Sequence, residues 1–157
     1  MQIDQDSARI RFPPPFVYLG FLLLGLAAER LTGLRSLGLD RTLLAVAGTL
    51  LFVAGLAIAL PSAGLFRRLG TNVEPWRPAT QIVSTGLYRW TRNPMYLGMA
   101  LSYAGLALGV DGPIALALLP VVLAIIQTQV IAREEAYLTA KFGEDYLDYR
   151  RRVRRWI

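Results

Sequence analysis

The stretch STGLYRWTRNPMYLG, residues 84–98, joins a polar, cationic segment to a long apolar one. Asn93 and Pro94 predict a helix start here, because an Asn side chain can cap free backbone N–H groups and Pro fits the first helical position. Taken alone, the stretch is also consistent with a helix start at a membrane surface, anchored by its aromatic and arginine side chains. A second polar stretch, REE at 133–135 followed by FGEDY at 142–146, favours a binding site over an anchor alone.

The composition around these stretches is typical of a membrane protein. The 157 residues are 54% apolar and 18% charged, with a mean hydropathy of +0.41, whereas soluble domains are about a quarter charged. The length indicates one domain, residues 1–157. The first fifteen residues contain Asp4 and Asp6 and lack an apolar core, so we expect no cleaved signal peptide.

The absence of two residue types excludes several kinds of chemistry. The chain contains neither cysteine nor histidine. Disulfides, thiolate nucleophiles, histidine bases and the Ser-His-Asp triad are therefore impossible, and we expect no metal site. The net charge of +6 is better explained by anionic lipid headgroups than by nucleic acid in a membrane protein, so no nucleic-acid partner is expected.

Four apolar blocks predict an all-α membrane protein with spans at about residues 14–30, 42–60, 95–110 and 113–131. The sequence PSAG at 61–64 predicts the end of the second span. The turn DGP at 111–113 predicts that the last two spans form an antiparallel hairpin. Pro120 predicts a kink in the fourth span, and the absence of a helix breaker before Gly143 predicts that this helix continues through Phe142.

The segment after the spans suggests contacts with lipid, and the third span suggests contact with a second copy of the chain. Beyond Gly143 an interfacial helix is predicted, in which Tyr146, Tyr149, Val153 and Trp156 share one face and neighbouring arginines meet anionic headgroups. The third span carries small residues at spacings of three and four, a pattern that would allow a homodimer.

Lysine and arginine counts predict the orientation. Fourteen lie in the amino-terminal arm, the second loop and the tail, against three in the other connections. The positive-inside rule therefore places both termini in the cytoplasm. The short chain, rich in Arg and Ala, suggests a bacterial inner membrane.

The same orientation puts the two polar stretches on one side, at the ends of neighbouring helices. The interiors of the predicted spans carry no charged residue, and Glu29 lies at a span end, which argues against a transporter, because transporters use intramembrane carboxylates or bases. Glu134 and Glu135 point about 100° apart on a helix, so we expect one to face the bundle and the other solvent. An inward Glu can accept hydrogen bonds from ribose hydroxyls or an ammonium group.

Taken together, these motifs resemble the carboxyl-terminal core of the isoprenylcysteine carboxyl methyltransferase and phospholipid methyltransferase superfamily. The matching motifs are GxY at 86–88, RNPMYxG at 92–98, EE at 134–135 and FGxxYxxY at 142–149, with GT at 70–71 and Pro75 upstream. They cover about residues 70–155, the expected cofactor-binding core.

The resemblance implies an integral membrane enzyme that transfers a methyl group from S-adenosylmethionine to a lipophilic acceptor, either an isoprenylcysteine-type carboxylate or a phospholipid amine. It implies that the cofactor contacts Gln81, Ile82, Val83, Tyr88, Asn93, Pro94, Met95, Tyr96, Glu134 and Glu135. No catalytic residue is assigned, and the candidates are Arg92, Arg133 and Tyr96, the arginines as groups that would meet an anionic headgroup or carboxylate.

Two positions differ from the carboxyl methyltransferases that the motifs resemble. Asn93 stands where those enzymes usually have His, and Val130 stands where they have an Arg for the substrate carboxylate. Two alternatives stay open: a membrane reductase of related topology that uses NADPH, and a non-enzymatic membrane scaffold or transporter.

Overall fold

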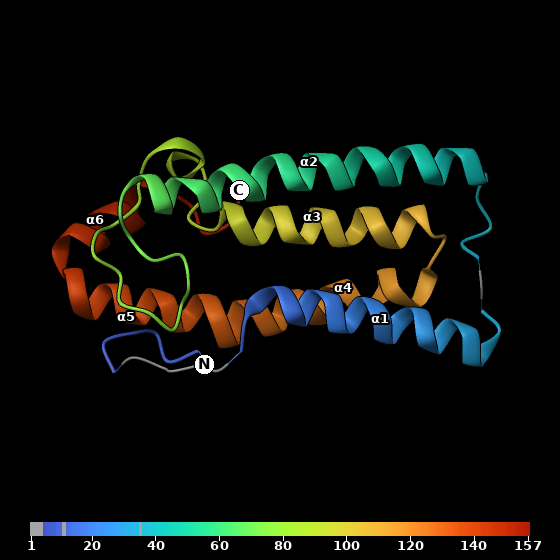
Figure 1. The fold of residues 1–157 in the computed structure, drawn as a ribbon, viewed down its shortest axis with the longest axis horizontal. Helices are drawn as coiled ribbons and strands as arrows, with labels where there is room; N and C mark the ends of the chain where they lie inside the picture. The colour runs from blue at the N-terminus through green and yellow to red at the C-terminus, as the bar shows by residue number, and fades with distance from the viewer. Residues whose placement is uncertain (1–4, 11, 35) are drawn as a thin grey trace.

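The computed structural model describes residues 5–10, 12–34 and 36–157, and over these residues the chain is helical, with one isolated β-bridge between Thr91 and Arg154. Figure 1 shows the helices as a bundle with a smaller cluster of helices and loops at one end. The all-α class predicted from the sequence is confirmed. The helices are α1 (Pro14–Thr32), α2 (Arg41–Arg68), α3 (Pro94–Gly109), α4 (Pro113–Ile125), α5 (Ala132–Phe142) and α6 (Glu144–Arg152), with a 3-10 turn η1 (Gly86–Arg89) and a π-helical segment η2 (Ile126–Ile131).

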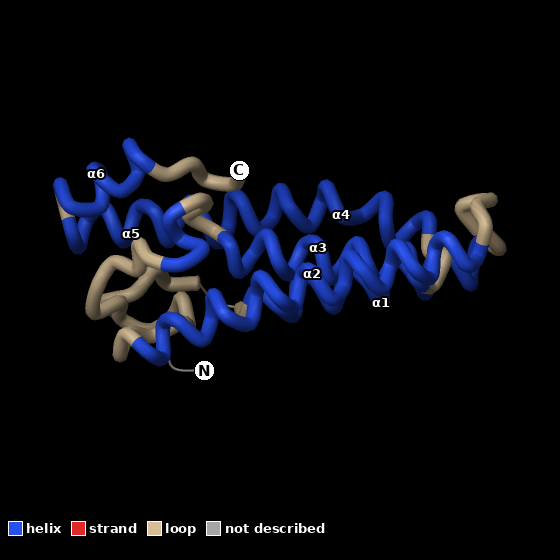
Figure 2. The backbone as a smooth tube through the Cα atoms, turned by 90° about the horizontal axis from the view of Figure 1, so that it is seen from above, coloured by secondary structure: helices blue, strands red, loops and turns tan. Residues whose placement is uncertain are grey.

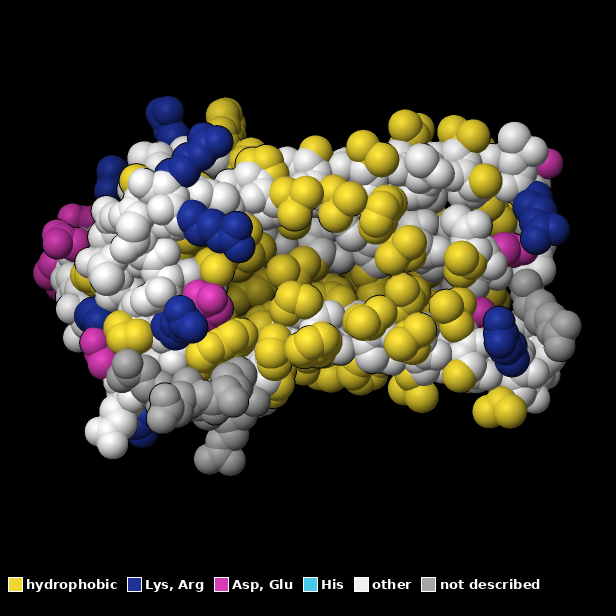
Figure 3. Space-filling model, viewed as in Figure 1, with side chains coloured by type: hydrophobic (Ala, Val, Ile, Leu, Met, Phe, Trp, Pro, Cys, Tyr) yellow, Lys and Arg dark blue, Asp and Glu magenta, His cyan; other side chains and the backbone are white. Residues whose placement is uncertain are grey.

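Three helices are long and apolar enough to cross a membrane: α1, α2 and the continuous helix Pro113–Phe142 formed by α4, η2 and α5. Helix α3 has 16 residues, about 24 Å at ~1.5 Å per residue, somewhat less than the ~30 Å hydrocarbon core. Figure 3 shows hydrophobic side chains along the side of the bundle and charged side chains towards its two ends. This distribution is that of an integral membrane protein.

Helices α2 and α3 pack through their glycines and lie side by side in Figure 1. A Cβ atom added at Gly55 would lie 2.5 Å from the carbonyl oxygen of Gly98, and one at Gly105 would lie 2.6 Å from that of Gly48. Contacts this short require glycine on both helices. The small-residue face of α3 is therefore covered by α2 of the same chain, and a homodimer stays a prediction that would need another surface.

Helix α2 corrects one prediction, because it continues past Pro61 to Arg68. Pro61 removes one backbone donor, but isolated prolines are tolerated in membrane helices where neighbouring groups satisfy the freed carbonyls. The carbonyl freed by Pro61 is that of Ala57, and in the same turn the hydroxyl of Ser62 donates to the carbonyl of Ile58 at 2.6 Å. The predicted helix end at residues 61–64 is therefore wrong, and the additional turns bring Phe66 to the clustered end of the bundle.

The helix that begins at Pro113 continues to Phe142, as predicted, and Gly143 ends it with a φ of +56°. Its departure from α geometry comes at η2 rather than at Pro120, which lies within α4. A π-helical turn rotates the residues that follow it relative to those before it, and such turns are frequent at functional sites. Here η2 ends at Ile131, three residues before Glu134.

The tail differs from its prediction. Helix α6 ends at Arg152, and Val153 has extended backbone angles (φ −121°, ψ 131°). Val153 and Trp156 therefore do not share a helical face with Tyr146 and Tyr149. The chain leaves the helix because its backbone pairs instead with the segment before α3, where the amide of Arg92 donates to the carbonyl of Arg154 at 2.9 Å. Figure 2 shows this segment running from α6 back towards the bundle.

Candidate functional site

A cavity of about 110 Å³ lies at the clustered end of the bundle. Its walls come from residues 72–83, from η1, from the first turn of α3 and from α5 and α6. Ten of the residues singled out from the sequence line it: Gln81, Ile82, Val83, Tyr88, Arg92, Asn93, Met95, Tyr96, Glu134 and Glu135. Pro94 is fully buried beside the cavity, and Arg133 is exposed and donates to the side chain of Gln129 instead.

Glu134 and Tyr96 meet at the cavity. The Tyr96 hydroxyl donates to Oε1 of Glu134 at 2.7 Å, and the Tyr96 backbone carbonyl accepts from the hydroxyl of Tyr18 on α1 at 3.1 Å. Among the residues that the structure describes, none donates a hydrogen bond to Oε2 of Glu134. A carboxylate oxygen is thus available to a ligand at a site lined largely by apolar and aromatic groups.

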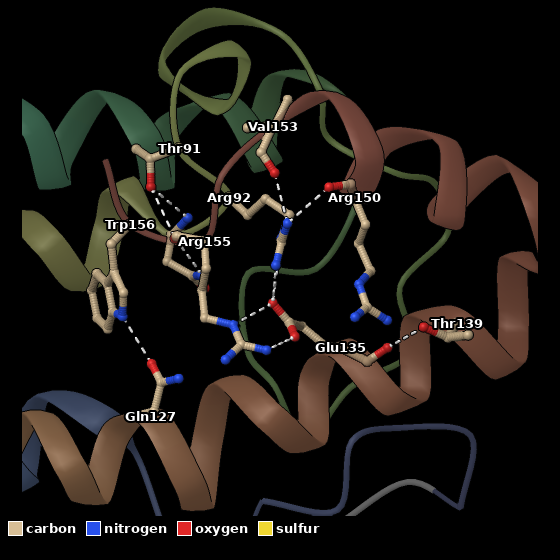
Figure 4. A network of polar contacts seen from close by, with 10 residues as sticks. Thr91, Arg92, Gln127, Glu135, Thr139, Arg150, Val153, Arg155 and Trp156 are labelled. Atoms are coloured by element: carbon tan, nitrogen blue, oxygen red, sulfur yellow. Dashed lines mark hydrogen bonds and ion pairs between the residues drawn. The ribbon is translucent and has the colours of Figure 1, made fainter.

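Glu135 points into a different polar cluster (Figure 4). Arg92 donates to Glu135 Oε1 through Nε at 3.3 Å and Nη2 at 2.8 Å. Arg155 donates to Oε1 at 3.0 Å and to Oε2 at 2.5 Å. The expectation that one glutamate of the pair faces solvent is therefore wrong. The tail folds over the side of α5 that would otherwise be exposed, and it leaves Glu135 only 7% exposed.

Asn93 occupies the N-cap position of α3, but its side chain does not cap the helix. The Asn93 side-chain amide donates to the backbone carbonyl of Arg155 at 2.9 Å. The predicted helix start at Pro94 is confirmed, whereas the predicted capping role of Asn93 is wrong. The hydrogen bond to the tail sets the orientation of the Asn93 side chain, which is 7% exposed.

Aromatic rings form one wall of the cavity. Phe66 packs edge-on against Tyr88 with ring centroids 5.5 Å apart, and Tyr149 donates its hydroxyl to the backbone carbonyl of Tyr88 at 2.8 Å. Tyr146 lies 6.0 Å from Tyr149, centroid to centroid. Burial raises the pKa of Tyr88, Tyr146 and Tyr149 above the usual value for tyrosine, so these rings stay neutral and their hydroxyls remain donors.

The segment 72–83 and the amino-terminal arm close the opposite side. The Tyr137 hydroxyl accepts from the amide of Ala79 at 3.0 Å and donates to the carbonyl of Asp6 at 3.1 Å. Asp6 also pairs with Lys141 at 2.5 Å, and Ala8 lines the cavity. Sequence reasoning did not predict the roles of Tyr137 and the arm, because these contacts join residues more than fifty positions apart.

Glu29, at the end of the first predicted span, has a structural role. Its Oε1 accepts from the amides of Ile114 and Ala115 at 2.8 and 2.9 Å, which caps the first turn of α4. The N-terminus of a helix favours a negative charge. No group of three or more acidic residues that could hold a metal ion occurs in the described part of the chain.

The fold and the cavity together define an integral membrane protein with a polar, aromatic-walled site at one end of its helical bundle. The chain belongs to the phospholipid methyltransferase family, whose profile matches residues 43–145. The matched region contains the cavity-lining part of α3, η2, and both glutamates of α5.

Individual relatives agree with this assignment. Over 72 residues the chain is 35% identical to the protein-S-isoprenylcysteine O-methyltransferase of Saccharomyces cerevisiae and 33% identical to that of Schizosaccharomyces pombe. Each alignment covers 46% of this chain but spans only 30% of the yeast protein. An uncharacterized Haemophilus influenzae protein is 42% identical over 64 residues, which are 40% of this chain and the whole of that protein. No solved structure matches the chain.

Proposed function

We propose that this protein transfers a methyl group from S-adenosylmethionine to a lipophilic acceptor in the membrane. Family membership supports a methyltransferase. The observation that carries the proposal is the pocket-facing carboxylate of Glu134, which is held by Tyr96 through one oxygen and leaves the other available beside tyrosine rings. A cationic ligand with hydroxyl or ammonium groups is complementary to this arrangement, since carboxylates bind such donors strongly and aromatic faces attract cations.

The lining residues suit this cofactor. Glu134 would accept from its ribose hydroxyls or ammonium group. Gln81 and Asn93 also line the cavity, but their amide nitrogens already donate to the backbone carbonyls of Leu69 and Arg155, so they would present their side-chain oxygens to a ligand. When bound, the cofactor supplies a methyl group already activated by its sulfonium. The protein's contribution is then to orient the reactants, which can lower a barrier by ~7–11 kcal/mol, and no covalent intermediate is needed.

The charges favour an amine over a carboxylate as the acceptor. The buried cation of the lining, Arg92, already donates to Glu135 and to the carbonyls of Arg150 and Val153. Val130 is fully buried in the core and carries no charge. The other cation among the lining residues that the structure describes is Arg77, which is exposed. A substrate carboxylate inside the cavity would therefore find no unengaged buried cation among these described residues, whereas a lipid amine requires none.

We also propose the membrane arrangement. Helices α3 and α4 form an antiparallel hairpin of spans, both termini lie in the cytoplasm of a bacterial cell, and the host membrane is the inner membrane. The exposed arginines of α6, Arg150, Arg151 and Arg152, then face anionic headgroups. Hydrophobic side chains along the bundle support its insertion in a membrane, and the lysine and arginine counts support this orientation.

The proposal is tested by calorimetric titration of S-adenosylmethionine and its demethylated product into detergent-purified protein. We expect saturable binding that weakens at least tenfold in Glu134→Gln, because the amide cannot pair with the cation as a carboxylate does. Glu144→Gln is the matched control, since its side chain is 79% exposed on α6. A folded protein that binds neither compound would exclude the methyltransferase, and binding of NADPH instead would identify a reductase.

A further inference from the structure

The C-terminal segment Val153–Trp156 lies outside the region matched by the family profile, yet it contacts both halves of the candidate site. We infer that Arg155 is a positioning residue for this site, which holds Asn93 through its backbone carbonyl and Glu135 through its guanidinium. The inference rests on the proposed function, because its consequence is measured as cofactor affinity.

The backbone of the segment binds the residues immediately before α3. The amide of Arg92 donates to the carbonyl of Arg154 at 2.9 Å. The carbonyl of Arg155 accepts from the Thr91 hydroxyl at 3.1 Å and from the Asn93 side chain at 2.9 Å. The segment thereby fixes the residues that lead into the first turn of α3, which carries Tyr96.

The Arg155 side chain binds the opposite wall. Its guanidinium donates to both oxygens of Glu135 on α5, at 3.0 and 2.5 Å, in the bidentate geometry that gives the strongest Arg–carboxylate pairs. One residue therefore joins the start of α3 to α5, as Figure 4 shows. Trp156 extends the connection by donating from its indole nitrogen to Gln127 of η2 at 2.8 Å.

The ion pair between Arg155 and Glu135 is largely buried, so its loss costs more stability than the loss of an exposed surface pair. The side chain of Glu135 is 8% exposed, and that of Arg155 is 35% exposed. Arg155 is the residue that donates to Oε2 of Glu135, whereas Arg92 donates to Oε1. Removing Arg155 leaves a buried carboxylate oxygen unpaired, which is costly, and this oxygen belongs to the residue next to Glu134. A shift of α5 in response would displace the carboxylate that faces the cavity.

The neighbouring arginine provides a matched control. The side chain of Arg154 is exposed and makes no hydrogen bond or ion pair with any residue that the structure describes, although its carbonyl is part of the backbone pairing. Arg154→Met and Arg155→Met therefore remove the same charge and the same side-chain type one position apart. Only the second breaks the contact with Glu135.

The experiment measures the dissociation constant of the demethylated cofactor product by calorimetry, together with the melting temperature of the ligand-free protein, in detergent. We expect Arg155→Met to weaken binding roughly tenfold, about 1.4 kcal/mol, Arg155→Lys to weaken it less, and Arg154→Met to leave it unchanged. We also expect Arg155→Met to have little further effect in a Glu135→Gln background, since coupled residues are not additive. A purely structural role would lower the melting temperature without this coupling in affinity.

Each other outcome overturns the inference. Equal affinities of the Arg155→Met and Arg154→Met variants would show that the contact does not position the site. Additive effects of the Arg155 and Glu135 substitutions would show that Arg155 does not act through Glu135. If Arg155→Met fails to fold, the same cycle with Arg155→Lys decides. Absence of binding by the unmodified protein would instead overturn the proposed function, and this inference with it.

Discussion

Two adjacent glutamates in this protein have different surroundings, and the difference is decided by single side chains. Glu134 receives one hydrogen bond from the neutral hydroxyl of Tyr96. Glu135 receives its bonds from two guanidinium groups. Charge on Glu135 is therefore neutralised within the protein, whereas Glu134 keeps hydrogen-bonding capacity for a ligand. The proposed function therefore predicts that Glu134 and its partner Tyr96 control ligand affinity.

The substitution Tyr96→Phe removes the donor to Glu134 and keeps the ring. Hydrogen bonds to charged groups contribute ~1.5–3 kcal/mol, so we expect roughly tenfold weaker binding of the demethylated cofactor product in calorimetry. Tyr103→Phe is the matched control, because the Tyr103 hydroxyl donates to the Ala115 carbonyl at 2.6 Å, away from the lining of the cavity. Unchanged affinity in Tyr96→Phe would show that Glu134 does not need this donor.

At the scale of elements, the close approach of α2 and α3 determines where the first turn of α3 lies. That turn carries Met95 and Tyr96 into the cavity, so the packing of the two helices along their length sets the geometry of the site. The contact is made through glycine backbone rather than through interdigitated side chains. It therefore has little capacity to absorb added atoms.

We expect Gly105→Val to destabilise the fold by ~1–3 kcal/mol or more, as overpacked interiors do. A Cβ atom at this position would lie 2.4 Å from the backbone nitrogen of Phe52 on α2. Gly109→Val on the same helix is the control, since a Cβ there meets nothing within 4 Å. Thermal unfolding in detergent compares the two variants, and equal melting temperatures would contradict the tight packing of α2 on α3.

At the scale of the whole molecule, the amino-terminal arm, segment 72–83, α6 and the tail gather at one end of the bundle (Figures 1 and 2). Asp6, Ala79 and Tyr137 are joined there by hydrogen bonds, so the site is assembled from the beginning, middle and end of the chain. The connection between α1 and α2 lies at the opposite end. The proposed orientation places the site in the cytoplasm.

This orientation is testable by cysteine labelling, because the chain contains no cysteine of its own. We expect Asp145→Cys on α6 to react with a membrane-impermeant maleimide only in inverted inner-membrane vesicles. Leu39→Cys, in the connection between α1 and α2 and at a position that is 57% exposed, should react only from the outer side of spheroplasts. The reverse pattern would invert the proposed topology. Labelling of both positions from the same side would show that an even number of membrane crossings separates them.

The sequence by itself determined the class of the protein and ten of the residues that line its cavity. Two kinds of local pattern carried this information: long apolar blocks, and the motifs around Asn93 and Glu134. The physical meaning of these patterns does not depend on distant residues. The helix start at Pro94 follows from the fixed φ of proline, and the helix end at Gly143 follows from the freedom of glycine to adopt a positive φ. Because these motifs are local, most residues predicted from them to contact the cofactor do line one cavity.

Only the tertiary structure decided how those residues are used. The continuation of α2 through Pro61, the side-chain partner of Asn93 and the direction of Glu135 each depend on groups distant in the sequence. Arg155 illustrates the reason. In the sequence it is one of several similar arginines in a basic tail, and the extended backbone after Arg152 brings it to a buried carboxylate 20 positions earlier. Hydrogen-bond partners are chosen by spatial proximity after folding, which residue type and spacing do not encode.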